Sequence, residues 1–187
     1  MPFHSFIVLF LFTILGVALF VRVITFRKAK FDFFGTPPID KFLFFSGKIT
    51  LFTNWGFFIY KAIAPESGFI SVSSYLSWGA TILLFFGTLF MVLAIYDLGP
   101  ALKVGLPDEE TLLKTNRIYT FSRHPLYLGG YLITIGSCLY FPDLINISFG
   151  LFAIFIHHLI VLAEEKFLSK KFGDQWKNYR EKTRRYF

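Results

Sequence analysis

Long stretches without a charged side chain alternate with short basic segments along this chain. The uncharged runs are residues 1–21, 67–96, 125–142 and 144–163. A helix needs about 20 mainly apolar residues to cross the hydrocarbon core of a bilayer. The pattern therefore predicts a membrane-spanning helix in each run. A secretory signal carries its positive residues before the apolar core, whereas Arg22 follows the first run, so we expect this helix to be retained.

A fifth apolar segment, residues 42–64, is interrupted by Lys48 and Lys61. The stem of a lysine can lie along apolar surface while its ammonium group reaches the interface. We therefore expect a fifth spanning helix here, with Lys48 reaching toward the membrane surface. The alternative is a four-span protein in which this segment lies on the surface.

Basic residues indicate the orientation of the helices. They gather in residues 22–41, 103–123 and 166–185, which share one side of the membrane if there are five helices. The opposite connections hold Lys61 as their only Lys or Arg, together with Glu66 and Asp143. Because connections rich in Lys and Arg stay in the cytoplasm, the N-terminus is expected outside and the C-terminus inside.

Composition agrees with a membrane protein. Of the 187 residues, 55% are hydrophobic, 21% aromatic and only 17% charged, against roughly 25% charged in ordinary soluble domains. The expected fold class is all-α, with about five transmembrane helices and a short cytoplasmic helical segment at the C-terminus. The single Cys138 excludes an internal disulfide and a multi-cysteine metal cage. Four histidines are too few for a membrane di-iron site, so we expect no metal. The stretch "FDFFGTPPID", residues 31–40, is expected to form an interfacial turn.

The stretch "FSRHPLYLGG", residues 121–130, is the first candidate site. Proline is well tolerated in the first turn of a helix, and the residue before it is disfavoured in helical conformation. Pro125 therefore starts the fourth helix, and His124 lies just outside the end that attracts anions. Gly129 and Gly130 indicate close approach of a neighbouring helix or of a flat ligand. Helix packing remains open as an alternative, because small residues recur at Gly130, Thr134 and Ser137 on one face.

The second candidate site lies at the end of the last apolar run. His157 precedes Glu164 by nearly two helical turns, and His158 precedes Glu165 by the same distance, so each pair shares a face. Ionisable groups at membrane depth usually point into a bundle or cavity. The alternative is that the two glutamates only mark the exit of the helix into water.

These two stretches together resemble a known family. "SRHPLYLGGYLITIG" and "AEEKFLSKKFGDQWKNYREKTRRYF" are similar to the RHPxYxG and EExxLxxxFGxxYxxY motifs of the isoprenylcysteine carboxyl methyltransferase and phospholipid methyltransferase superfamily. The resemblance covers roughly residues 97–186. It implies a division into N-terminal transmembrane helices, residues 1–96, and a C-terminal methyltransferase core, residues 97–187.

The resemblance implies an integral membrane enzyme that uses S-adenosylmethionine. The cofactor pocket of that superfamily is formed by the last two membrane helices and the C-terminal segment. Carried over onto this chain, the cofactor-binding residues would be His124, Pro125, Tyr127, Gly129, Glu164, Glu165, Trp176 and Tyr179. Arg123 and His124 would suit the cofactor's carboxylate. The implied partners are the lipid bilayer and a lipidic or apolar methyl acceptor, and no nucleic acid.

The acceptor is less clearly indicated. Prenylcysteine-type members carry an arginine shortly before the glutamate pair, where this chain reads "IHHLIVLA". His157 and His158 are the candidate replacements, and with Arg123 they are the expected catalytic residues. A prenylcysteine-like carboxylate therefore stays open as the acceptor, and a phospholipid amine or a thiol, with a histidine or glutamate as base, is equally open. A histidine serves as a base near neutral pH and an arginine does not, so activity rising through about pH 6–7 is expected. Two alternatives are a sterol-type membrane reductase that uses NADPH and a non-enzymatic membrane protein that retains the fold.

Overall fold

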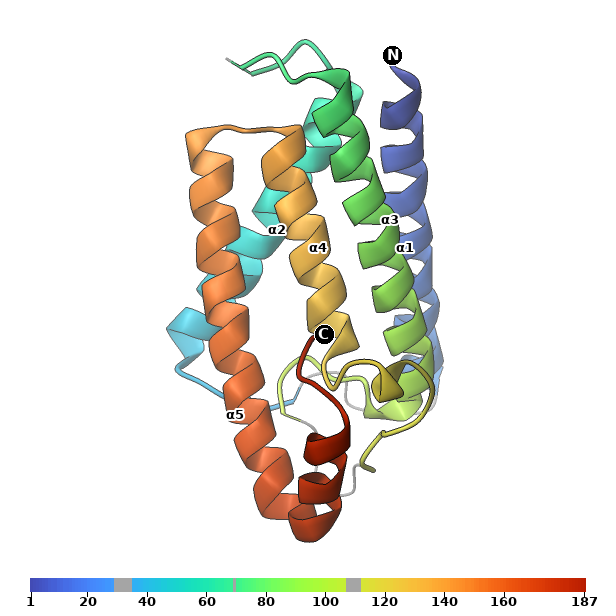
Figure 1. Cartoon of the computed structure of the whole chain (residues 1–187), viewed down its shortest axis with the longest axis vertical. Helices are drawn as coiled ribbons and strands as arrows, with labels where there is room; N and C mark the ends of the chain where they lie inside the picture. Colours follow the sequence, from blue (N-terminus) through green and yellow to red (C-terminus); the bar gives the residue numbers. More distant parts are fainter. Residues whose placement is uncertain (29–34, 69, 107–111) are drawn as a thin grey trace.

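The computed structural model describes residues 1–28, 35–68, 70–106 and 112–187. These ranges form an all-α bundle (Figure 1). Its helices are α1 (Phe3–Lys28), α2 (Lys41–Ile63), α3 (Ser74–Leu98), α4 (Pro125–Tyr140) and α5 (Leu144–Lys182), with the 3-10 turns η1 (Gly99–Ala101) and η2 (Arg117–Thr120). The only β pairing in the described ranges is an isolated bridge between Thr36 and Leu106. The predicted all-α class is confirmed.

Four of the described helices, α1, α2, α3 and α5, are long and apolar enough to cross a membrane. The chain is therefore an integral membrane protein. The fifth, α4, has 16 residues and is about 24 Å long, which is shorter than the roughly 30 Å hydrocarbon core. Figure 1 shows the start of α4 ending short of the neighbouring ends of α3 and α5. The helix α4 therefore extends less far toward that end of the bundle than its neighbours.

The segment with the interrupting lysines is part of the bundle. α2 runs obliquely behind α4 and α5 (Figure 1) and buries Asn54, Trp55 and Phe58. Asn54 Nδ2 donates to Asn146 Oδ1 of α5 at 2.7 Å, and Trp55 Nε1 donates to Thr134 Oγ1 of α4 at 3.0 Å. These contacts with two other helices are incompatible with the alternative in which residues 42–64 lie on the membrane surface.

The helices alternate in direction, which brings the basic segments to one end. The α1–α2 connection, the α3–α4 connection and the C-terminal tail all lie at the end opposite the N-terminus (Figure 1). Two backbone hydrogen bonds join the first two connections: Gly35 N to Val104 O at 3.0 Å, and Leu106 N to Thr36 O at 2.8 Å. Residues 31–34 of the expected interfacial turn lie outside the described ranges. We call this end of the bundle the basic end.

Small residues allow α3 and α4 to touch. A Cβ atom on Gly129 would lie 2.6 Å from Gly87 O of α3, and one on Gly136 would lie 3.0 Å from Ala80 O. Lipid tails are as apolar as leucine, so membrane helices associate through close packing and hydrogen bonds more than through hydrophobic burial. The neighbouring side of α4, which carries Gly130, Thr134 and Ser137, packs against α2, and Ser137 Oγ donates to Asn54 O at 2.6 Å. The interpretation of these small residues as a helix-packing surface is confirmed.

The last helix reverses direction near its end. Gly173 has φ 48° and ψ −119°, a left-handed conformation that side chains with a Cβ rarely adopt. The long membrane segment of α5 therefore turns at Gly173 into a short helix that runs back toward the bundle (Figure 1). Residues 183–187, the C-terminal tail, follow this short helix and reach the start of α4.

Candidate functional site

A cavity of about 120 Å³ lies at the basic end of the bundle, next to the start of α4. Its walls come from the α3–α4 connection, from the start of α4 and from both arms of α5 around Gly173. Six of the residues singled out in the sequence line it: Arg123, His124, Tyr127, Glu164, Trp176 and Tyr179. The fold thus brings the two sequence motifs together around one cavity.

The start of α4 positions His124. Pro125 occupies the first turn and is buried, and His124 precedes it with φ −130° and ψ 57°, as the pattern predicts. The imidazole is 5% exposed. Its Nδ1 lies 3.9 Å from Glu164 Oε2, and its Nε2 lies 3.3 Å from Glu165 Oε1 without the geometry of a hydrogen bond. Within the described ranges, Nε2 has no hydrogen-bond partner.

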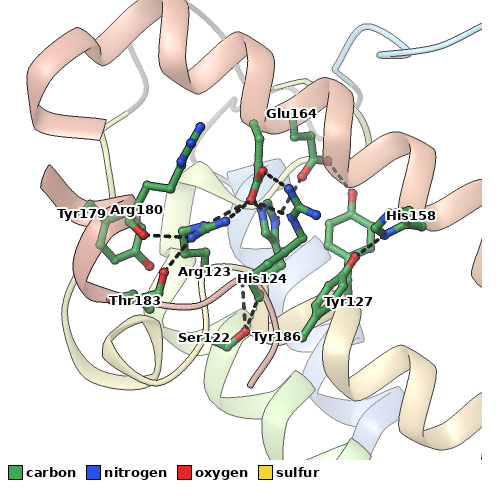
Figure 2. A network of polar contacts seen from close by, with 12 residues as sticks. Ser122, Arg123, His124, Tyr127, His158, Glu164, Tyr179, Arg180, Thr183 and Tyr186 are labelled. Atoms are coloured by element: carbon green, nitrogen blue, oxygen red, sulfur yellow. Dashed lines mark hydrogen bonds and ion pairs between the residues drawn. The ribbon is translucent and has the colours of Figure 1, made fainter. Parts of the chain in front are cut away.

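Tyr127 and Glu164 form the inner wall of the cavity. The hydroxyl of Tyr127 donates a hydrogen bond to Glu164 Oε1 (Figure 2). The Tyr127 ring also lies between two histidines, with ring centroids 5.9 Å from His124 and 6.2 Å from His157. This contact fixes one carboxylate oxygen of Glu164 and leaves the other, Oε2, toward His124.

Glu165 is the next residue, yet it has a different environment. Arg123 donates to its Oε1 through Nε at 3.1 Å and through a terminal nitrogen at 2.8 Å. Arg185 donates to both carboxylate oxygens, at 3.1 and 2.7 Å. Hydrogen bonding to Glu165 raises the pKa of Arg185. The expected cofactor contact of Glu165 is not apparent in this geometry, because both oxygens are taken by arginines and the residue does not line the cavity.

Arg123 holds the C-terminal tail. Besides Glu165, its guanidinium donates to Thr183 O at 2.6 Å and to Arg180 O at 3.2 Å (Figure 2). It also lies 5.7 Å from the Trp176 ring centroid. Its backbone N–H donates to Arg184 O at 3.0 Å. Nearly every donor of the guanidinium therefore has a partner in the protein. The contacts are those of a clamp on the tail, and they do not support the catalytic role expected from the sequence.

The two histidines of α5 lie on different faces. His157 is 4% exposed and its Nδ1 lies 2.8 Å from Ala153 O. A carbonyl oxygen only accepts, so Nδ1 carries the proton, and Nε2 has no partner within the described ranges. His158 Nδ1 instead lies 2.8 Å from the hydroxyl of Tyr186 in the tail (Figure 2). Neither histidine lines the cavity.

Of the expected residues Trp176, Tyr179 and Gly129, the first two line the cavity and the third does not. Trp176 is 2% exposed and lies on the cavity wall with Tyr179, whose hydroxyl donates to Tyr119 O at 2.6 Å. Burial raises the pKa of Tyr119 well above its usual range, so its hydroxyl stays protonated. Gly129 does not line the cavity, because its open side is filled by α3. It admits a helix, and there is no room there for the flat ring that the resemblance implies.

Arg185 and Tyr186 belong to the site although the sequence pattern does not single them out. Both lie in a basic tail, "TRRYF", whose charges indicate membrane orientation alone. Their partners, Glu165 and His158, are separated from them by 20 and 28 positions and become neighbours only through the reversal at Gly173. The described ranges contain no group of three or more His, Cys, Asp or Glu residues that would hold a metal ion.

Comparison with known proteins adds the family. The model of the phospholipid methyltransferase family matches residues 75–175, which is more than half of the chain. The match includes α3, the start of α4 with His124 and the membrane segment of α5 with Glu164 and Glu165. No curated protein matches the chain. The match spans both motif-bearing helices at the cavity, and the chain belongs to the phospholipid methyltransferase family of membrane methyltransferases.

Proposed function

We propose that this protein is an integral membrane methyltransferase that uses S-adenosylmethionine to methylate a lipidic or apolar acceptor at the cytoplasmic membrane face. Residues 97–187 form its methyltransferase core, and residues 1–96 supply the supporting helices. The observation that carries the proposal is the cavity at the basic end, where both motifs of the matched family meet.

The residues at the cavity fit the chemistry of adenosylmethionine. His124 lines the cavity, and its buried Nε2, 3.3 Å from Glu165 Oε1, makes no hydrogen bond within the described ranges. The start of α4 beside it favours an anion such as the cofactor's carboxylate. Glu164 Oε2 is available to an ammonium group or to ribose hydroxyls. Trp176 offers aromatic surface for an adenine ring. When bound, adenosylmethionine supplies an electrophilic methyl group.

The side chains around this cavity position groups and exclude water. Tyr127 fixes the carboxylate of Glu164, and the clamp of Arg123 and Arg185 on Glu165 keeps the tail against the start of α4. Alignment of the reacting groups and exclusion of water are the main demands of an in-line displacement. The buried Trp176 and Tyr179 cover the cavity on the water side.

We further propose that the acceptor is an amine or thiol and that His157 receives its proton. With Nδ1 donating to Ala153 O, neutral His157 has its lone pair on Nε2, where no described group competes for it. Its ring centroid lies 6.2 Å from that of Tyr127, and it precedes Glu164 by seven residues in the apolar part of α5. An acceptor with a lipid chain would approach along this apolar part. No arginine precedes the glutamates on α5 to bind a prenylcysteine carboxylate.

Calorimetry on the detergent-purified chain separates the functional classes. Binding of adenosylmethionine but not of NADPH would support the methyltransferase. Binding of NADPH alone would favour a reductase of the sterol type, and binding of neither would indicate a non-enzymatic membrane protein.

The cytoplasmic placement of the basic end has its own test. In a Cys138→Ala background, Ser71→Cys in the α2–α3 connection should react with a membrane-impermeant thiol reagent added to intact cells. Thr115→Cys in the α3–α4 connection should react only after permeabilisation. Labelling of both from the same side would contradict the proposed orientation.

A further inference from the structure

Lys48 is a charged residue within the membrane-spanning helix α2, and it does not line the cavity. It lies seven residues after the start of α2, about 10 Å into an apolar helix. It is half-buried, and its ammonium group lies 5.2 Å from the centroid of the Phe44 ring, one turn nearer the basic end. It forms no ion pair with any carboxylate of the described residues. Charges at membrane depth are costly and usually mark functional sites.

The crossing of α2 and α5 places Lys48 beside the inner wall of the candidate site. Gly47 contacts Ile156 so closely that a Cβ atom on Gly47 would collide with it. The residues that follow these two in the sequence are Lys48 and His157. The close contact of Gly47 with Ile156 thus brings Lys48 and His157 to neighbouring positions on the two helices. A cation on α2 and an imidazole with an unpartnered nitrogen on α5 therefore lie near the crossing of these helices, where Tyr127 packs against the apolar side chains.

Lys48 does not line the cavity, and apolar packing lies beside it. Phe44, Ile156 and Ile160 form a buried cluster between α2 and α5, and Tyr127 packs against it. A ligand that reaches Lys48 would therefore come from the lipid rather than through the cavity. Because the ammonium group points back toward the basic end, it lies near the depth where lipid headgroups meet the acyl chains.

We propose that Lys48 binds the anionic group, a phosphate or carboxylate, of the lipidic methyl acceptor at the crossing of α2 and α5. This inference rests on the proposed methyltransferase function and adds a specificity residue from a helix outside the region matched to the family. The anion held there leaves a nearby nucleophile of the same headgroup facing His157. An acceptor with a short linker between its anionic group and its amine or thiol fits this arrangement.

Lipid binding to the purified full-length protein tests the proposal by native mass spectrometry. The ligands are didecanoyl phosphatidic acid, decanoic acid and uncharged didecanoylglycerol. The wild type should bind phosphatidic acid at least tenfold more tightly than the diacylglycerol, which corresponds to about 1.4 kcal/mol. Lys48→Met should reduce this preference to less than twofold, whereas Lys48→Arg should keep most of it. A matching preference for decanoic acid would show that the site takes carboxylates as well as phosphates.

Lys41→Met is the matched control, because Lys41 lies on the same face of α2 two turns nearer its start and is exposed. It should leave the preference unchanged. A Lys48→Met protein that keeps the wild-type preference, or a wild type without one, would overturn the proposal. Calorimetry with adenosylmethionine on the same samples distinguishes failure of the lysine proposal from failure of the methyltransferase function. If the wild type does not bind adenosylmethionine, the methyltransferase function is wrong. The Lys48→Met protein should bind adenosylmethionine as tightly as the wild type.

Discussion

The two faces of α5 that meet the start of α4 differ in what their polar groups contact. On the Tyr127 face, His157 and Glu164 lie against Tyr127, and His157 Nε2 has no described partner. On the tail face, one residue further along, His158 and Glu165 contact Tyr186, Arg123 and Arg185 in the C-terminal tail and the α4 entry. One face retains free hydrogen-bonding capacity and the other has used it.

This difference indicates which polar groups are free to bind a ligand and which stabilise the fold. A buried polar group without a partner is costly, so proteins retain such groups mainly where a ligand supplies the missing contact. A carboxylate whose oxygens both accept from guanidinium groups has little left to offer a ligand. Neighbouring glutamates in one motif can therefore have different roles: Glu164 faces the cavity, and Glu165 anchors the C-terminal tail.

Removal of the charge of Glu165 should have the largest effect. Glu165→Gln leaves the buried Arg123 and the half-buried Arg185 without a counter-ion, and breaking a buried ion pair costs about 3 kcal/mol or more. Thermal unfolding in detergent should shift to lower temperature, and proteolysis should release the C-terminal tail more readily. The control is Glu181→Gln, an exposed carboxylate in the short helix that follows Gly173. Wild-type stability combined with weaker adenosylmethionine binding would move Glu165 into the cofactor site.

The Tyr127 face should respond in the opposite way. Glu164→Gln and His124→Ala are each expected to weaken adenosylmethionine binding at least tenfold, or about 1.4 kcal/mol, in calorimetry. Unfolding should change little in Glu164→Gln, because glutamine can still accept from Tyr127. Cofactor affinity equal to that of the wild type in either variant would remove that residue from the pocket.

A residue of the Tyr127 face, His157, should have a smaller effect, on the pH dependence of activity. The rate of methyl transfer should rise with pH as a histidine loses its proton and gains a lone pair for the acceptor. His157→Gln should abolish this rise while leaving adenosylmethionine affinity nearly unchanged. The charged and titratable neighbours are Lys48 on α2, Tyr127 on α4 and Glu164 on α5, so Lys48→Met should be profiled in parallel. A rise that persists in His157→Gln would exclude this histidine as the base.

Loss of the imidazole on the tail face should have the smallest effect. His158 contacts Tyr186 and does not line the cavity, so His158→Gln should change the turnover rate less than threefold and keep the pH profile. A loss as large as that in His157→Gln would mean that the acceptor approaches from the tail face. The comparison between the two variants is informative because they are adjacent residues with the same side chain.

Much of this architecture follows from sequence. Uncharged runs predict the helices because backbone polar groups inside a bilayer must be satisfied within the segment. Pro125 starts α4 because its ring suits a first helical turn, and the seven-residue spacing puts His157 with Glu164 on one face and His158 with Glu165 on another. The two motifs also predict that the start of α4 meets the end of the last membrane segment, as the structure shows.

Only the tertiary structure decided which partner each of these side chains received. Arg123 and Glu165 are motif residues, but the reversal at Gly173 returns Arg185 to them and turns both into a tail clamp. Gly129 has the same local signal whether it faces a ring or a helix, and the approach of α3 determined the outcome. Periodicity gives the direction of a side chain around its own helix axis. What lies in that direction depends on contacts between segments far apart in the chain, and local sequence does not encode them.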